Sequence, residues 1–112
     1  MCDLAWAAGF FDGEGNAHFY DRVNPRTGKR NVTVGMNVSQ SGPFIPDALA
    51  RFARVVGFGK IYGPTHRPGR QPVWRWQVAG FGDVPTVARL LLPLLSGAKH
   101  TQVSAVLAAI DR

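Results

Sequence analysis

Apolar and polar residues alternate with a period of two in the first third of the chain, which predicts β-strands. Ala17, Phe19 and Val23 form the apolar set over residues 16–23. Over residues 31–40 the apolar set is Val32, Val34, Met36 and Val38. Residues 24–30, which are rich in proline, glycine and basic side chains, lie between the two stretches. We therefore expect a long β-hairpin with one buried and one polar face.

A second hairpin is predicted from residues 60–62, a loop over residues 63–72, and a returning strand over residues 73–78. In the returning strand the alternation directs Trp74, Trp76 and Val78 inward. Arg75 and Gln77 then point outward, on the same kind of polar face as in the first hairpin.

Helical spacing separates and flanks these hairpins. Residues 5–15 form an apolar helix rich in small residues, and residues 43–56 form a second helix that Gly57 ends. Asp83 is expected to cap a helix over residues 84–95, and a last helix begins near Ala98. The order is αββαββα with an extra terminal helix. It predicts an α+β fold, with helices on one face of a four-stranded antiparallel sheet, in a single domain spanning residues 1–112.

Composition agrees with an intracellular domain. The chain has 112 residues, 46% of them hydrophobic, and no segment long enough to span a membrane is expected. Cys2 is the single cysteine, no cysteine and histidine cluster has zinc spacing, and no secretory signal is recognised.

The net charge of +6 is concentrated in the predicted hairpins. Residues 16–40 and 58–80 contain eight basic residues and one acidic residue, which predicts a polyanionic partner. Polar side chains suited to base edges lie on the outer sheet face, and basic side chains suited to phosphates lie in the loops. The first set is Asn16, His18, Tyr20, Arg22, Asn31, Thr33, Asn37, Arg75 and Gln77, and the second is Arg26, Lys29, Arg30, Arg67 and Arg70. Alternatively, this face is only the solvated side of a half-buried sheet.

The first helix ends in two carboxylates, Asp12 and Glu14. A helix C-terminus carries partial negative charge, so acidic residues are unfavourable there unless a cation is present. A hard divalent cation would be held by a glutamate carboxylate and a backbone carbonyl such as that of Gly13. The alternative is that both acids are solvated turn residues beside glycines.

Ala5, Gly9 and Gly13 recur every fourth residue of the same helix and form a strip that another helix could approach closely. This strip predicts a homodimer interface, in which we include Ala8 and Asp12. An ordinary buried helix is the alternative reading.

Residues 7–15, Ala-Ala-Gly-Phe-Phe-Asp-Gly-Glu-Gly, resemble the nine-residue signature of the LAGLIDADG homing endonucleases. Gly9, Asp12, Glu14 and Gly15 occupy signature positions, with glutamate in place of the usual final aspartate. The resemblance implies that Glu14 binds the catalytic metal and that Asp12 is structural. It also implies catalytic roles for Gln40, at the end of the second strand, and for Lys99. The implied fold is the family's helix and hairpin order, with the sheet as a saddle on DNA.

One signature copy implies a homodimer, because one subunit supplies one Glu14. The implied activity is hydrolysis of double-stranded DNA at a long near-palindromic target. It would depend on Mg²⁺, or on Mn²⁺ or Ca²⁺ in the same site, and would leave short 3′ overhangs as in intron homing. No membrane and no small-molecule cofactor are expected, and the compartment would be a prokaryotic cytoplasm or an organelle. Alternatives are a non-cleaving maturase or transcriptional regulator of the same fold, and a small basic structural protein.

Overall fold

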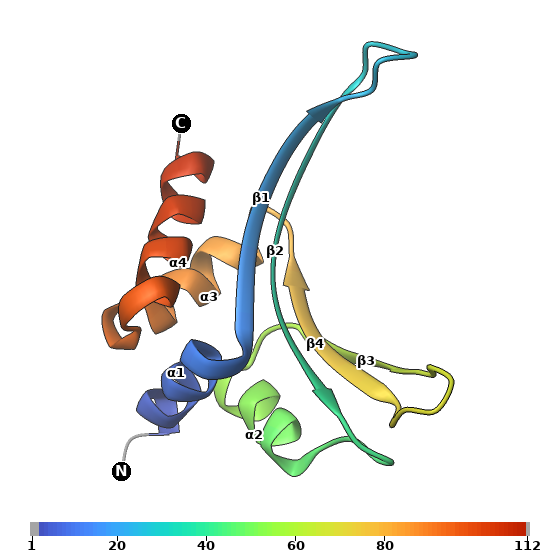
Figure 1. Ribbon diagram of the computed structural model, residues 1–112. Coiled ribbons are helices and arrows are strands. Elements are labelled where there is room, and N and C mark those ends of the chain that lie inside the picture. The colour runs from blue at the N-terminus through green and yellow to red at the C-terminus, as the bar shows by residue number, and fades with distance from the viewer. Residues whose placement is uncertain (1–2, 112) are drawn as a thin grey trace.

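One antiparallel sheet of four strands organises the molecule, with every helix on one side of it (Figure 1). The computed structural model describes residues 3–111. The strands are β1 (Gly15–Val23), β2 (Arg30–Ser41), β3 (Lys60–Thr65) and β4 (Val73–Ala79), and they lie in the order β1-β2-β4-β3. The predicted α+β class and element order are confirmed.

The helices are α1 (Asp3–Glu14), α2 (Asp47–Val56), α3 (Asp83–Leu91) and α4 (Gly97–Ile110), with a short 3₁₀ helix, η1 (Leu92–Leu94), before α4. Gly57 ends α2 with a φ of 78°, as the sequence predicted.

Two predicted helix boundaries are wrong, and proline explains both. The second helix begins at Asp47 rather than at residue 43, because Pro46 has an extended backbone and disfavours helical geometry in the residue before it. The third helix ends at Leu91, since Pro93 has no N–H to continue the helical hydrogen bonds. Asp83 is likewise not a cap: it lies in the first turn of α3 after Gly82, and no side chain caps that helix.

The strand register places the predicted polar residues on one face. Asn16 lies opposite Asn37, and Asn37 lies opposite Gln77 on β4, so three amide side chains form a row across the sheet. Tyr20 pairs with Thr33 in the same way. In Figure 1 this face is the concave one, which no helix covers.

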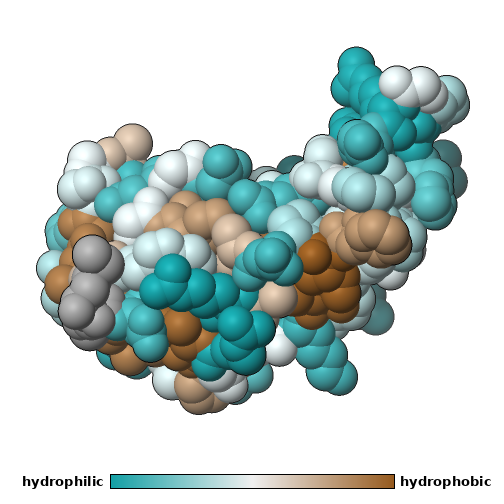
Figure 2. All heavy atoms as spheres, turned by 90° about the horizontal axis from the view of Figure 1, so that it is seen from below, coloured by the Kyte–Doolittle hydropathy of each residue, from teal (hydrophilic) through white to brown (hydrophobic). Residues whose placement is uncertain are grey.

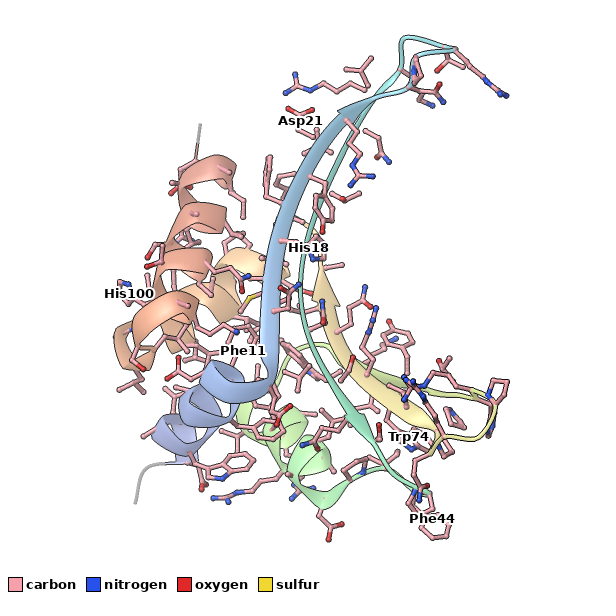
Figure 3. The ribbon with its side chains drawn as sticks, in the orientation of Figure 1. Phe11, His18, Asp21, Phe44, Trp74 and His100 are labelled. Atoms are coloured by element: carbon pink, nitrogen blue, oxygen red, sulfur yellow. The ribbon has the colours of Figure 1, made fainter. Side chains whose placement is uncertain are left out.

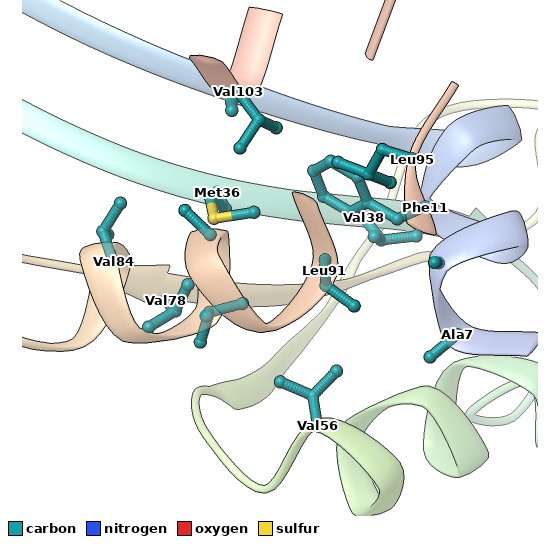
Figure 4. Packing of buried hydrophobic residues seen from close by; sticks show 14 of the residues in the cluster. Ala7, Phe11, Met36, Val38, Val56, Val78, Val84, Leu91, Leu95 and Val103 are labelled. Carbon is teal, nitrogen blue, oxygen red and sulfur yellow. The ribbon is translucent and has the colours of Figure 1, made fainter. Parts of the chain in front are cut away.

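The opposite face of the sheet packs on the helices to form the hydrophobic core (Figure 4). Phe11, Phe52 and Trp76 are fully buried, and the last two rings meet edge to face with centroids 4.8 Å apart. No polar or charged residue is classed as buried within residues 3–111. Burying a phenylalanine side chain contributes about 2–3 kcal/mol, so these rings hold α1 and α2 firmly on the sheet.

Gly15 is required where α1 meets β1. A Cβ atom at this position would lie 2.3 Å from Cδ2 of Phe11, much closer than non-bonded carbon atoms approach. The glycine that closes the segment 7–15 therefore allows the Phe11 ring to occupy the core directly beneath the start of β1.

The large apolar side chains of α1 pack within the protomer. Trp6 stacks on Phe10 with an interplanar angle of 8°, and Phe10 contacts Phe52 of α2. The Trp6 and Phe10 side chains are thus half-buried against the core of the protomer.

No helix in the described part of the chain combines the length and the apolar character needed to cross a membrane.

Candidate functional site

The concave sheet face carries stacked side chains along β1 as well as the row of amides. The rings of His18 and Tyr20 stack with centroids 4.9 Å apart, and the Arg22 guanidinium lies 4.8 Å from the centre of the Tyr20 ring. Gly35 makes room for this arrangement, because a Cβ atom there would lie 2.7 Å from Cε1 of His18. The stack thus runs from His18 through Tyr20 to Arg22, which is exposed on the arm of the first hairpin.

Most of the predicted DNA-contacting residues are exposed on this face or at the two hairpin loops. The exposed ones are Asn16, Tyr20, Arg22, Arg26, Lys29, Asn31, Thr33, Arg67, Arg70 and Arg75, while His18, Asn37 and Gln77 are half-buried between neighbouring side chains. The hairpin connecting β1 and β2 extends well beyond the helices (Figure 1).

Arg30, which the sequence predicts as a phosphate contact of the loop, is exposed and is the first residue of β2. It lies on the helix side of the sheet, since it shares the parity of Val32 and Val34, and it pairs there with Asp21. Its Nε donates to Asp21 Oδ1 at 2.7 Å and its second guanidinium nitrogen donates to Oδ2. Figure 3 shows Asp21 on the side of β1 opposite to His18. Arg30 therefore lies on the opposite face of the sheet from Arg22, and its contact with phosphates stays a prediction.

The Arg30 guanidinium changes the titration of its partner. Its hydrogen bonds, with a smaller Coulombic contribution, lower the pKa of the Asp21 carboxyl from the ordinary value, and the carboxylate raises the pKa of Arg30 in turn. Both side chains are exposed, so the pair fixes the geometry of the hairpin arm more than it stabilises the fold.

Glu14 lies at the junction of α1 and the sheet, in an open pocket of about 630 Å³. The other lining residues are Ser39, Gln40, Ser41, Pro46, Ala48, Arg67 and Val73. Among residues 3–111 no hydrogen bond or ion pair engages the Glu14 carboxylate, so its oxygens are available to a ligand. The structure thus brings together Glu14 and Gln40, which are 26 positions apart in the sequence.

Gln40 lines this pocket, and its side-chain amide oxygen has an unusual environment. Its Oε1 atom is buried and has no hydrogen-bond partner in the described structure. Leaving a buried oxygen without a hydrogen-bond partner costs about 1–3 kcal/mol of stability. Natural proteins keep such an atom mainly where a ligand or a function requires it.

Glu14 gives the pocket a carboxylate, a hard oxygen ligand of the kind that divalent cations prefer, beside the hydroxyls of Ser39 and Ser41. No group of three histidine, cysteine, aspartate or glutamate residues that could hold a metal occurs within residues 3–111.

Asp12 has a different environment from Glu14. Its Oδ1 accepts a hydrogen bond from the Ser96 backbone N–H at 3.1 Å, and its Oδ2 accepts one from the Ser96 hydroxyl at 3.0 Å. Ser96 precedes the first residue of α4, so the Asp12 carboxylate lies at the positive end of that helix. This contact favours a structural role for Asp12 within the protomer.

The basic residue that shares the pocket with Glu14 is Arg67, from the loop between β3 and β4. Lys99 is half-buried in the first turn of α4 and is not among the residues that line the pocket. From the sequence, Arg67 was predicted only as a phosphate contact. A loop has no periodic pattern, so the sequence does not indicate that Arg67 lies near the end of β2.

The predicted interface strip is present in part. Ala5, Gly9 and Gly13 are exposed along α1, and a Cβ atom at either glycine would meet no atom of the protomer within 4 Å. Ala8 is wrong as an interface residue, since it is fully buried in the protomer core. Figure 2 views the molecule from below, where hydrophobic atoms form separate patches among hydrophilic ones rather than one continuous area.

Comparisons of the structure with solved structures identify its relatives. The homing endonuclease I-CvuI, bound to its target in the presence of Ca, matches with a TM-score of 0.73 and 28% identity. I-CvuI bound to the I-CreI target in the presence of Mg, with the DNA not cleaved, matches with a TM-score of 0.70 and 30% identity. Each alignment covers 96% of this chain and 65% of the I-CvuI chain. The chain has the LAGLIDADG homing endonuclease fold.

The LAGLIDADG homing endonuclease I-GzeII, in complex with its DNA target, superposes with a TM-score of 0.78 at 14% identity. That alignment covers 96% of this chain and 35% of the I-GzeII chain, so at this identity the likeness concerns the fold alone. No family model and no curated protein matches the sequence. The structural matches confirm the resemblance that residues 7–15 suggested.

Proposed function

We propose that this chain is a site-specific DNA endonuclease of the LAGLIDADG type, which acts as a homodimer with a divalent cation. The observation that carries the proposal is the free Glu14 carboxylate, which shares a pocket with the unpartnered Gln40 Oε1 at the edge of a polar concave sheet. The fold supports it, because I-CvuI and I-GzeII were both solved in complex with DNA.

The sheet is suited to hold double-stranded DNA. Its concave face carries amide, hydroxyl and guanidinium groups that match base edges in a major groove. Arg26, Lys29 and Arg70, which are exposed in the two hairpin loops, are suited to the flanking phosphates. The excess of basic residues in the hairpins supplies the long-range attraction that brings DNA to this face.

Glu14 and the Gly13 carbonyl would hold the cation together with the Glu14 of a second protomer. When bound, such a cation supplies Lewis-acid stabilisation of the phosphodiester and favours ionisation of the attacking water. Gln40 would orient that water through its amide. A positive side chain, Arg67 or Lys99, would offset the charge that develops on the phosphate oxygens. Water is the nucleophile in this mechanism, so no side chain of the protein is needed for that role. The expected products carry short 3′ overhangs.

Pairing of two α1 helices through Ala5, Gly9 and Gly13 would place the two Glu14 carboxylates near one two-fold axis. The target would then be near-palindromic, because each half-site meets the same sheet. The chain spans 65% of I-CvuI and 35% of I-GzeII, which is consistent with one repeat of the fold per subunit.

The dimer is tested by replacing Gly9 with leucine. The protomer has room for a side chain at this position, so the variant is expected to fold, whereas a closely packed partner helix would be displaced. The matched control is Ala108→Leu, on an exposed position of α4. Sedimentation is expected to give a dimer for the native chain and the control, and a monomer for Gly9→Leu. A native chain that cleaves as a monomer would contradict the paired-helix model.

The activity is tested by incubating the native chain with a randomised duplex library in Mg²⁺ or in EDTA, and by sequencing both the bound and the cut molecules. Metal-dependent cutting at one near-palindrome is the expected result. Enrichment of a site without cutting would instead support a binding protein of the same fold, such as a maturase or a regulator. Cutting in EDTA would exclude the metal-dependent mechanism.

A further inference from the structure

One side chain of α4 closes the outer edge of the sheet beside Glu14. Oε1 of Gln102 accepts a hydrogen bond from the backbone N–H of Ala17 at 3.0 Å. Because β1 is the first strand in the sheet order and pairs with β2 alone, its outward N–H groups have no strand partner. Gln102 satisfies one of them, and its Nε2 donates to Oδ1 of Asn16 at 3.2 Å.

The donor and acceptor of each hydrogen bond in this series are determined by the groups involved. A backbone N–H can only donate, so Gln102 must present its oxygen to Ala17 and its nitrogen to Asn16. An amide nitrogen can only donate as well, so Asn16 must present its oxygen to Gln102. The two Nδ2 hydrogens are then the unengaged end of the Asn16 amide. The usual ambiguity between amide oxygen and nitrogen does not arise here, because the Ala17 N–H determines both orientations.

Asn16 occupies a decisive place on the concave face. It is exposed, it comes two residues after Glu14, and it begins the row of amides that continues through Asn37 and Gln77. Reading an adenine with an asparagine uses both the oxygen and the nitrogen of the amide. Because Gln102 already engages the oxygen of Asn16, the amide nitrogen is the end of the side chain that remains free for a base.

We infer that Gln102 is a positioning residue that sets Asn16 as a hydrogen-bond donor toward an acceptor atom on a base in the major groove. In that groove guanine offers N7 and O6 as acceptors, adenine offers N7 and thymine offers O4, whereas cytosine offers only its N4 donor. The inference rests on the proposed function, and it adds the base chemistry that this position of the target must have. Gln102 itself need not touch DNA to influence the target sequence.

The experiment measures base preference by binding selection on a duplex library, in EDTA, for the native chain and for variants of these two residues. Asn16→Ala is expected to remove the discrimination against cytosine at one position of each half-site. Gln102→Glu is expected to reverse that discrimination, so that cytosine is favoured through its N4 donor by about fivefold or more, the size of one hydrogen bond. The reversal follows because a carboxylate at position 102 accepts from both neighbours and turns the Asn16 oxygen toward the DNA.

Two further variants keep the test independent of folding at the sheet edge. Asn16→Asp retains an acceptor for Gln102 and directs a second acceptor toward the groove, so it is expected to favour cytosine or adenine as well. Gln102→Met removes the orienting amide and is expected to relax the preference without reversing it. The matched control is Thr101→Val, because the Thr101 hydroxyl bonds only to its own helix at Gly97 O. This control is expected to keep the native preference.

The inference is overturned if Asn16→Ala leaves every base preference unchanged, or if Gln102→Glu retains the native preference. A uniform loss of affinity with no change in preference also overturns it, since that result identifies Asn16 as a phosphate contact. These outcomes leave the proposed endonuclease intact if the native chain still selects and cuts a site. A native chain that selects no duplex overturns both proposals.

Discussion

Asp12 accepts two hydrogen bonds from Ser96, which joins the last turn of α1 to the start of α4. Glu14, two residues later, accepts none from the described residues and faces the pocket. The two carboxylates at the end of α1 therefore have different environments, although only Gly13 separates them in the sequence. Asp12 fixes the helix end in space, and Glu14 is the group that this arrangement presents.

We expect Asp12→Ala to destabilise the fold by about 1–2 kcal/mol, since it removes two hydrogen bonds and a favourable interaction with the N-terminus of α4. Urea unfolding of the variant measures this change. Asp83→Ala is the matched control, because the Asp83 side chain makes no cap hydrogen bond at the start of α3. Equal stability of the two variants would show that the contact with Ser96 contributes nothing.

We expect Glu14→Gln to abolish metal-dependent cleavage while retaining DNA affinity. The carboxylate is exposed and makes no contact that stabilises the protomer, so the free energy of unfolding should change by less than about 0.5 kcal/mol. Cleavage assays in Mg²⁺ and binding assays in EDTA separate the two effects. Cleavage at the native rate would remove Glu14 from the metal site.

Gln40→Leu is expected to raise stability and lower cleavage together. Replacing the unpartnered buried oxygen with an apolar group removes a cost of about 1 kcal/mol, while the pocket loses its amide. Thermal unfolding and single-turnover cleavage are the measurements. A variant that is less stable than the native chain would mean that Oε1 has a partner in solution.

The ion pair between Asp21 and Arg30 predicts a pH dependence of the hairpin arm. Because folding lowers the pKa of Asp21, the pair contributes stability above the ordinary carboxyl pKa. That contribution is lost as the pH falls through the lowered pKa of the folded state. The difference in melting temperature between the native chain and Asp21→Asn should therefore shrink toward zero at acidic pH. A difference that is constant between pH 2 and pH 7 would contradict this account.

Much of the fold followed from the sequence because its signals are local. Alternation placed the strand faces correctly, since one face of β2 and β4 packs on the core while the other is polar. The helix boundaries near Pro46 and Pro93 failed where proline geometry prevailed over hydrophobic spacing. The ion pair between Arg30 and Asp21 was not predicted, because the sequence assigns Arg30 to the turn, whereas it is the first residue of β2.

The site was predictable only as far as the family signature reaches. Glu14 and Gln40 were identified by the resemblance, and the structure brings them to one pocket. The contacts of Asp12 with Ser96 and of Gln102 with Asn16 each join residues more than 80 positions apart. No periodicity within either segment reports on such a long-range hydrogen bond.

In the proposed mechanism either Arg67 or Lys99 supplies the positive charge near the scissile phosphate, and Arg67 is the one that lines the pocket with Glu14. We expect Arg67→Ala to lower the cleavage rate at saturating DNA by about tenfold to a hundredfold, because a charged group facing the reacting phosphate acts mainly in the transition state. Lys99→Ala should have the smaller effect on that rate.

Arg70→Ala is the matched control for the loop, since Arg70 is exposed in the same connection between β3 and β4 but does not line the pocket. Its loss should weaken DNA binding about equally for all sequences and reduce the salt dependence by about one phosphate contact. Single-turnover cleavage and binding at several salt concentrations distinguish these roles. If Lys99→Ala lowers the rate more than Arg67→Ala does, Lys99, which the family resemblance implies, supplies the positive charge near the phosphate. Lys99 must then approach Glu14 when DNA or a second protomer is bound.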